Sequence, residues 1–183
     1  MSKFLLGISG GAGAGKDTLY TLLSERVNCK RVALADSLKS ELRPFILEKF
    51  SIDLFDCPRE EKDLVRPILV EYARVKRRQS PDYFIKKVHG YVTSCHTNIV
   101  ITDIRYLNEI DWLKNLGGKL VHIKKYKEID GKRVYSEPFI PDEIENDPKL
   151  QAAADYKIEW PEVKDLNELS CYADELLLFL NHV

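Results

Sequence analysis

The stretch "ISGGAGAGKDT" at residues 8–18 decides the fold. Its glycines and Lys16 have the spacing of a phosphate-binding loop, in which Gly-Lys is normally followed by Ser or Thr. Here Asp17 follows the lysine, and the hydroxyl comes one residue later, at Thr18. The apolar run "KFLLGIS" before the loop predicts a buried strand, and leucines at helical spacing after it predict a helix. Together they form the context that a phosphate-binding loop requires.

In such a loop the backbone amides turn inward around oxyanions, and the N-terminus of the following helix adds its dipole. Lys16 is expected to reach the outer phosphates of a nucleotide. A Gly-rich turn with an exposed lysine is the alternative. We predict that the nucleotide binds to one continuous run, Gly11, Ala12, Gly13, Ala14, Gly15, Lys16, Asp17 and Thr18.

Asp17 is unexpected beside a polyphosphate, because both are negatively charged. The carboxylate is tolerable if Mg²⁺ or its water molecules lie between them, so we predict that Asp17 helps to hold a hydrated metal. Thr18 is expected to face the inner phosphates, because one step around a helix turns a side chain by about 100°. The alternative is that Asp17 only complements the positive end of the helix dipole.

The clearest strand is "NIVITD" at residues 98–103, which ends in an acid. Ligands of an open parallel sheet sit at the carboxyl ends of its strands, so Asp103 is a second candidate for Mg²⁺. Arg105 follows at the same edge and can grip a phosphate with two hydrogen bonds. Lys16, Asp103 and Arg105 are thus the predicted catalytic residues. The alternative is that Asp103 caps the next helix and Arg105 pairs with Glu109.

Two motifs of other nucleotide-binding proteins are missing. Ile104 follows the strand acid, where motor ATPases place a glutamate that activates water, and the chain has no N-K-x-D motif for guanine. Neither built-in hydrolysis nor guanine switching is supported. Transfer of phosphate to a second bound substrate is favoured.

Many cations lie between the strand expected at "RVALA", residues 31–35, and the strand at 98–103. Helices are expected from Asp36, over 59–78 and in a segment that has Pro81 in its first turn. Phosphoryl transfer brings two anionic substrates together, so this segment, 36–95, is predicted to bind the acceptor. For the cations, the alternative is a solvated charged face. For Tyr83, the alternative is packing in the core. The candidate substrate-binding residues are Asp36, Ser37, Lys39, Arg43, Arg66, Arg74, Arg78, Asp82 and Tyr83.

Residues 126–153 are polar and contain three prolines, so we expect an insertion or lid over 125–150 rather than core. Asp130 and Gly131 suit a tight turn, and the lysines around them could close over the transferring phosphate. An exposed charged hairpin is the alternative. A last strand is expected at "DYKIEW" and a last helix over 165–181. Strands that alternate with helices predict a parallel α/β sheet.

The chain has 183 residues, 44% hydrophobic and 31% charged, with a net charge of −1, as expected for a single globular domain. This charge gives no global attraction to polymeric nucleic acid. The longest apolar runs are too short to span a bilayer, so no membrane partner is expected. The widely spaced cysteines favour reduced thiols in a cytoplasm, that of the host for a viral protein. The four cysteines lack metal-site spacing. The amphipathic C-terminal helix could serve a homodimer interface as easily as a core.

Several segments resemble the deoxynucleoside monophosphate kinases of tailed bacteriophages. The most specific are the Gly-Lys-Asp-Thr loop and "TDIRYLNE" at 102–109, and "SEP" at 136–138 and "ADYKIEW" at 154–160 also fit. Ala73 stands where that family usually has a glycine. The other matching segments are "ALADSLKSELR" at 33–43 and the long helical stretch at 60–88.

The resemblance implies a phosphate-loop kinase with a three-layer α/β/α fold, a five-stranded parallel sheet, acceptor-binding helices and a lid. It implies transfer of the γ-phosphate of ATP, with Mg²⁺, to a deoxynucleoside monophosphate. Lys16 and the loop amides would hold ATP, Arg105 would bridge phosphates, and residues 36–43 and 66–83 would form the acceptor site. A kinase for another phosphorylated acceptor, such as a phosphomevalonate-type kinase, stays open, as does an ATP-binding regulatory protein without turnover. No motif reports the base or the sugar.

Overall fold

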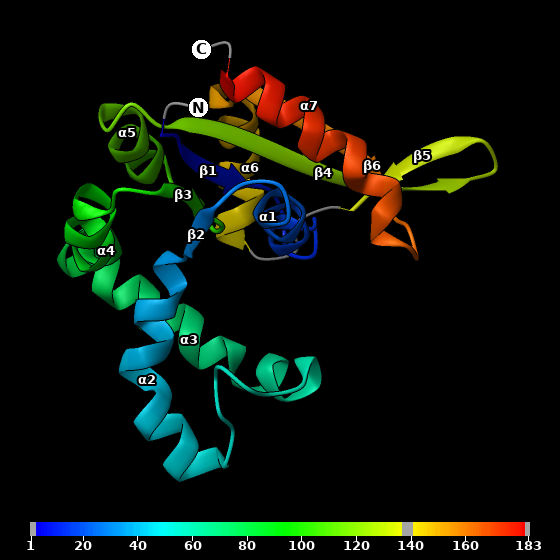
Figure 1. Ribbon diagram of the computed structural model, residues 1–183. Helices are drawn as coiled ribbons and strands as arrows, with labels where there is room; N and C mark the ends of the chain where they lie inside the picture. Colours follow the sequence, from blue (N-terminus) through cyan, green and yellow to red (C-terminus); the bar gives the residue numbers. More distant parts are fainter. Residues whose placement is uncertain (1–2, 137–140, 182–183) are drawn as a thin grey trace. The chain divides into compact units, whose positions relative to one another are not determined.

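The computed structural model describes residues 3–136 and 141–181. The chain divides into two compact units. One unit contains the chain up to Val32 and again from Thr93, and it carries the sheet and the phosphate-binding loop (Figure 1). The other unit is Ala33–Val92 and is helical.

The sheet has six strands in the order β2-β3-β1-β4-β5, with β6 also paired to β4. Every pairing is parallel except that of β5 with the far end of β4. The predicted parallel sheet of five strands is therefore confirmed, and β5 makes it mixed. The strands are β1 (Leu5–Ser9), β2 (Cys29–Val32), β3 (Asn98–Ile101), β4 (Lys119–Ile129), β5 (Lys132–Tyr135) and β6 (Tyr156–Pro161).

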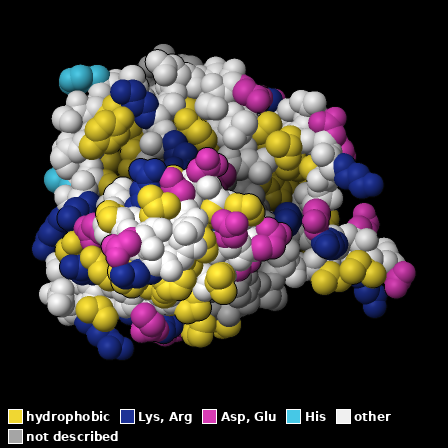
Figure 2. Space-filling view, turned by 90° about the horizontal axis from the view of Figure 1, so that it is seen from below, with side chains coloured by type: hydrophobic (Ala, Val, Ile, Leu, Met, Phe, Trp, Pro, Cys, Tyr) yellow, Lys and Arg dark blue, Asp and Glu magenta, His cyan; other side chains and the backbone are white. Residues whose placement is uncertain are grey.

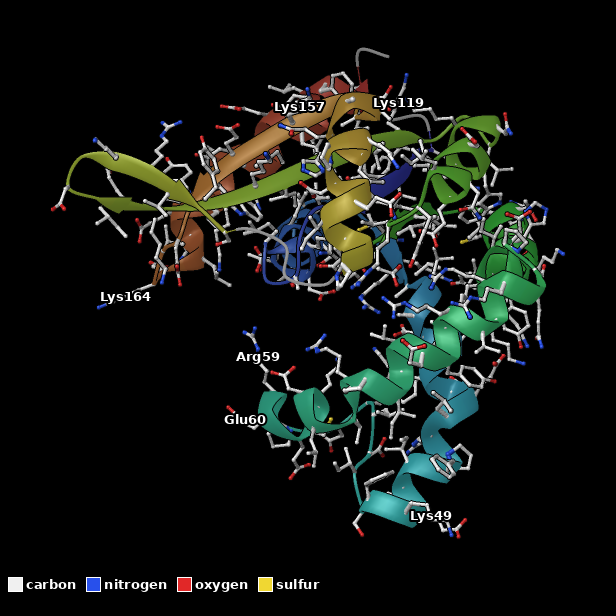
Figure 3. The ribbon with its side chains drawn as sticks, turned by 180° about the vertical axis from the view of Figure 1, so that it is seen from behind. Lys49, Arg59, Glu60, Lys119, Lys157 and Lys164 are labelled. Carbon is white, nitrogen blue, oxygen red and sulfur yellow. The ribbon has the colours of Figure 1, made fainter. Side chains whose placement is uncertain are left out.

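Helices cover both faces of this sheet, so β1, β3 and the first half of β4 are mostly buried. On one face α1 (Lys16–Ser24) packs against α7 (Ser170–Asn181), which follows a short 3₁₀ turn, η1 (Leu166–Leu169). The other face carries α5 (Leu107–Asn115) and α6 (Pro141–Ala153), which contact β4 and each other. Figure 1 shows α7 in front of the sheet, and Figure 3, from behind, shows α6 in front of it.

The helical unit is built from α2 (Leu34–Phe50), α3 (Arg59–Gln79) and most of α4 (Tyr83–Ser94). Apolar residues at helical spacing, such as Leu38 and Leu42 of α2 and Val65 and Leu69 of α3, are buried. The opposite faces carry charge, and Lys49, Arg59 and Glu60 point outward (Figure 3).

The strand predicted at residues 31–35 exists, but its predicted end is wrong. β2 stops at Val32, and α2 already begins at Leu34, so that Asp36 falls in its first turn. The run "VALA" is apolar enough for either structure. Leu34 and Leu38 decide for a helix, because their spacing of four places both on one buried face.

Residues 126–153 contain more regular structure than their prolines suggest. β4 and β5 form a hairpin that extends beyond the other strands (Figure 1), and Asp130 and Gly131 make its turn with positive φ angles of 51° and 71°. Helix α6 runs through Pro148 and buries Leu150. Of the segment "SEP", Glu137 and Pro138 lie outside the described residues. Within 3–136 and 141–181, no helix is both long and apolar enough to cross a membrane.

Candidate active site

The loop between β1 and α1 has the conformation that its glycines permit. Gly10, Gly13 and Gly15 have φ angles of 133°, 80° and 97°, which side chains disfavour. At Gly15 space is restricted as well, because an added Cβ would lie 2.6 Å from Cζ2 of Trp160. The loop is therefore tied to a conformation in which its amides can surround an anion.

Trp160, at the end of β6, holds this loop from the sheet side. Its indole Nε1 donates a hydrogen bond of 2.9 Å to the carbonyl oxygen of Ala14, and the side chain is 1% exposed. The ring fills the space that Gly15 leaves. Sequence reasoning placed Trp160 in a strand but gave it no role, because its partner lies 146 residues away along the chain.

Lys16 begins α1 and its ammonium group turns back over the loop. Nζ donates to the carbonyl oxygens of Gly10, at 2.6 Å, and Gly11, at 2.8 Å. Burial, with the neighbouring positive charge of Arg105, lowers the pKa of Lys16 from its usual 10.5 to about 8. Because desolvation makes the ammonium group costly to charge, an anionic ligand beside Lys16 would stabilise its charged form.

Arg105 lies beyond β3, where the sequence predicted it, but its partner differs from the alternative considered there. The guanidinium group forms an ion pair with Glu143 of α6, rather than with Glu109. Glu109 instead accepts hydrogen bonds from the backbone N–H groups of Arg105, at 2.7 Å, and Tyr106, at 3.1 Å, and so caps α5. Asp103 is not the capping residue, since Tyr106 occupies the N-cap position.

Glu143 is a component of the site that the sequence did not reveal. Its side chain is 8% exposed. Besides the ion pair with Arg105, its Oε2 accepts a hydrogen bond of 3.3 Å from the backbone N–H of Ala12 in the loop. One carboxylate thus contacts both an amide and a guanidinium that were predicted to bind phosphate.

The two predicted metal ligands differ in position. Asp103 is buried at the end of β3, and its negative charge acts on Lys16. The side chain of Asp17 is 78% exposed and pairs with Arg31, at 3.1 Å from Nε. Thr18 is half-buried in the first turn of α1. Among the described residues, no group of three His, Cys, Asp or Glu side chains could hold a metal ion.

His122 of β4 is a second buried polar residue that the sequence analysis did not single out. Its Nδ1 lies 3.0 Å from Oγ of Ser9, the last residue of β1, and its Nε2 lies 3.6 Å from a carboxylate oxygen of Asp147 in α6. Burial, with the positive charges of Lys124, Lys16 and Lys157, lowers the pKa of His122 to about 4. The imidazole is therefore neutral at neutral pH.

In the helical unit, most of the predicted acceptor-binding cations have acidic neighbours. Figure 2 shows Lys and Arg side chains interspersed with Asp and Glu on the face in view. Ser37 hydrogen-bonds the carbonyl oxygen of Leu34, and Arg78 and Asp82 are exposed. The ion pairs are Lys39 with Asp36, Arg43 with Asp53, Arg66 with Asp63, and Arg74 with Glu71.

Tyr83 belongs to a polar network centred on Glu41. The carboxylate of Glu41 accepts hydrogen bonds from the hydroxyls of Tyr72 and Tyr83, both at 2.9 Å, and pairs with Lys87 at 2.8 Å. Burial alone would raise the pKa of Glu41, but the hydrogen bonds from Lys87, Tyr83 and Tyr72 lower it overall. Lys76 lies over both tyrosine rings.

The groups around the loop are hydrogen-bond donors and positive charges. Loop amides, a buried ammonium group and a guanidinium converge at the carboxyl edge of a parallel sheet, and such groups stabilise charge on a transferring phosphate. A comparison with known protein families gives a match to the phosphomevalonate kinase model over residues 8–119, more than half of the chain. The chain belongs to the phosphomevalonate kinase family.

Other relatives agree with a kinase. A protein of Acanthamoeba polyphaga mimivirus, named "Putative deoxynucleotide monophosphate kinase", is 26% identical to this chain. The match covers 77% of this chain and 81% of the mimivirus protein. A shikimate kinase from Bacteroides thetaiotaomicron has 16% identity and a TM-score of 0.54, covering 98% of this chain and 99% of that chain. Dephospho-CoA kinase from Campylobacter jejuni has 11% identity and a TM-score of 0.53, covering 98% of both chains.

The solved structures show that the fold is that of phosphate-loop kinases. Membership of the phosphomevalonate kinase family adds the class of reaction: the protein is a kinase that transfers phosphate from an ATP-type nucleotide to a small phosphorylated or related acceptor. The kinase part of the resemblance found in the sequence is thereby confirmed.

Proposed function

We propose that this protein transfers the γ-phosphate of ATP to a deoxynucleoside monophosphate and releases ADP and a deoxynucleoside diphosphate. The observation that carries the proposal is the convergence of Lys16 and Arg105 on one phosphate-binding loop. Their positive charges would stabilise the γ-phosphoryl group as it leaves ADP.

In this reaction an oxygen of the acceptor's phosphate attacks the γ-phosphorus, and the bond to the β-phosphate oxygen breaks with its electron pair leaving on ADP. Mg²⁺ would supply further positive charge along the phosphate chain. Asp103 fits a role in holding the ion, directly or through water, because it is a buried carboxylate at the same edge as Lys16. Asp17 would have to break its ion pair with Arg31 before it could contact the ion or its water molecules.

The acceptor is proposed to bind the helical unit, over residues 36–95. Its cations would offset the acceptor's phosphate, and an aromatic side chain such as Tyr83 could stack on a base. Support for a nucleotide acceptor comes from the named activity of the mimivirus relative, which covers most of both chains. The segment 125–150 is proposed to act as the lid.

A phosphomevalonate-type acceptor is the second candidate, and the family match favours it. Both acceptors present a phosphate, so the same cations suit either. The two acceptors differ because only the nucleotide carries a base. A phosphomevalonate kinase therefore needs no aromatic side chain to stack on one.

An acceptor panel tests the proposal. Purified protein, ATP and Mg²⁺ are incubated with each deoxynucleoside monophosphate, each ribonucleotide and phosphomevalonate, and ADP is measured. Formation of ADP that depends on a deoxynucleoside monophosphate supports the proposal. Turnover with phosphomevalonate alone would favour the second candidate, and tight ATP binding without any turnover would indicate a regulatory protein.

Lys16→Ala serves as the control for the panel. It should lose most turnover, by a factor of at least about 100, while the protein still folds, because the transferring charge loses its partner. Arg105→Ala should impair turnover and acceptor binding together. Near-normal turnover of Lys16→Ala would contradict the proposed site.

A further inference from the structure

Glu143 occupies contacts that a phosphate would need. The backbone N–H of Ala12 points to its Oε2, at 3.3 Å, and the guanidinium of Arg105 pairs with its Oε1. The positive charge of Lys16 also interacts with it, since Glu143 raises the pKa of that lysine. All three groups were assigned to phosphate binding from the sequence.

The position of Glu143 runs against what packing alone would select. Helix α6 buries this carboxylate, whereas the next residue, Ile144, is 54% exposed. Burial costs the carboxylate its hydration, so its contacts with Arg105 and the Ala12 amide must offset that cost. Glu145, two residues further, is 76% exposed and pairs with Lys149, so an inward carboxylate is not general to the helix.

We propose that Glu143 is a positioning residue that holds Arg105 and the Ala12 amide in place of phosphate, and that nucleotide binding displaces it. In the absence of nucleotide, Lys16 and Arg105 are two neighbouring positive charges in a partly desolvated site. A carboxylate offsets that repulsion and fixes the guanidinium. The inference rests on the proposed nucleotide site, but not on the identity of the acceptor.

Displacement follows from the geometry of the contacts. The one hydrogen of the Ala12 amide makes one good hydrogen bond, and a polyphosphate brings more negative charge to it than a carboxylate does. Glu143 and a phosphate oxygen would also repel each other at the distance of a shared donor. The contacts of Glu143 must therefore be given up before the phosphates bind, which lowers the apparent affinity for nucleotide.

Glu143→Gln tests this inference, with Glu145→Gln as the matched control on the same helix. Binding of ATP and of inorganic tripolyphosphate is measured by titration calorimetry, each with Mg²⁺ and with a chelator. Removing one charge-assisted contact should tighten binding of both ligands by roughly tenfold. Glu145→Gln should leave both affinities unchanged. A purely packing role for Glu143 would not increase affinity. Removal of its negative charge alone would, and the amide exchange of the first turn of α6 described below separates that effect from displacement.

The other outcomes separate the inference from the proposed function. Unchanged or weaker binding of ATP to Glu143→Gln, with normal binding to the wild type, overturns the inference and leaves the nucleotide site standing. Weaker binding only in the presence of Mg²⁺ overturns it in favour of a metal ligand. If neither protein binds ATP, both the inference and the proposed function fail.

A measurement on the wild type covers the case that Glu143→Gln does not fold. Amide hydrogen exchange is compared with and without ATP. The loop at residues 10–15 should exchange more slowly with ATP, while the first turn of α6, around Glu143, should exchange faster because it loses its contacts with Ala12 and Arg105. Slower exchange in that turn would overturn the inference.

Discussion

At the residue scale, the lowered pKa of Lys16 has a measurable consequence for nucleotide binding. Burial and Arg105 hold this pKa at about 8 in the free protein, and bound phosphates would raise it. Below pH 8 the lysine is charged in both states. Above it the free lysine is neutral and must take up a proton on binding, so ATP affinity should fall by up to about tenfold per pH unit between pH 8 and 10.

Calorimetry in buffers with different ionisation enthalpies counts that proton directly. Uptake should approach one proton as the pH rises from 7 to 10. Lys16→Ala should bind ATP more weakly, and its binding should not take up this proton. Equal pH dependence in the two proteins would show that another group titrates.

The contact between Gly15 and Trp160 predicts an asymmetry among the loop glycines. Gly15→Ala should lower the free energy of unfolding by about 2–4 kcal/mol, because it combines a left-handed backbone with a clash against Trp160. Gly13 also has a positive φ, but no atom lies within 4 Å of an added Cβ. Gly13→Ala should therefore lose only about 1–2 kcal/mol. Urea unfolding followed by circular dichroism compares the two, and equal losses would mean that Trp160 adjusts freely.

At the scale of elements, Glu41 joins three helices, since its partners Tyr72 and Tyr83 come from α3 and α4. Glu41→Ala should lower the free energy of unfolding by about 1–3 kcal/mol, because two hydroxyls and Lys87 lose their shared acceptor. Glu48, on the same helix, is 70% exposed. Glu48→Ala should change the stability by less than about 0.5 kcal/mol. Chemical denaturation of both variants measures the difference. Similar losses in the two variants would show that the Glu41 network does not stabilise the fold.

The elements that the sequence predicted well are those with local signals. The glycine spacing, the apolar run before it and the β-branched run at β3 each lie within a dozen residues, and all three were found. The start of α2 was missed because "VALA" is apolar in any secondary structure. Helix α6 was missed because Pro141 and Pro148 were taken as breaks, although Pro141 begins the helix and the first turn tolerates a proline.

The residues of the candidate site also divide into those with local sequence signals and those without. Lys16 and Arg105 follow from motifs, because loop and strand end fix where they lie. Glu143, His122 and Trp160 contact partners that are 131, 113 and 146 residues away. No periodicity reports such contacts. They depend on how helix α6 and strands β4 and β6 pack against the loop, which only the fold determines.

At the scale of the whole molecule, His122 links folding stability to pH. Its pKa is about 4 in the folded protein and about 6.5 when unfolded, so between these values the unfolded chain binds more protons. Stability should therefore fall as the pH falls from 6.5 to 4, by up to about 3 kcal/mol from this residue. Burial raises the pKa of Asp147, which acts in the opposite direction, because its folded form gains a proton first.

His122→Gln removes the first contribution and keeps the second. Its free energy of unfolding, measured by urea titration at pH 7, 6, 5 and 4, should fall less steeply than that of the wild type over this range. His96 is exposed, so His96→Gln should keep the wild-type slope. If all three proteins lose stability in parallel, the imidazole is protonated in the folded state, and a charged His122 beside Asp147 would then add a positive charge under the phosphate-binding loop.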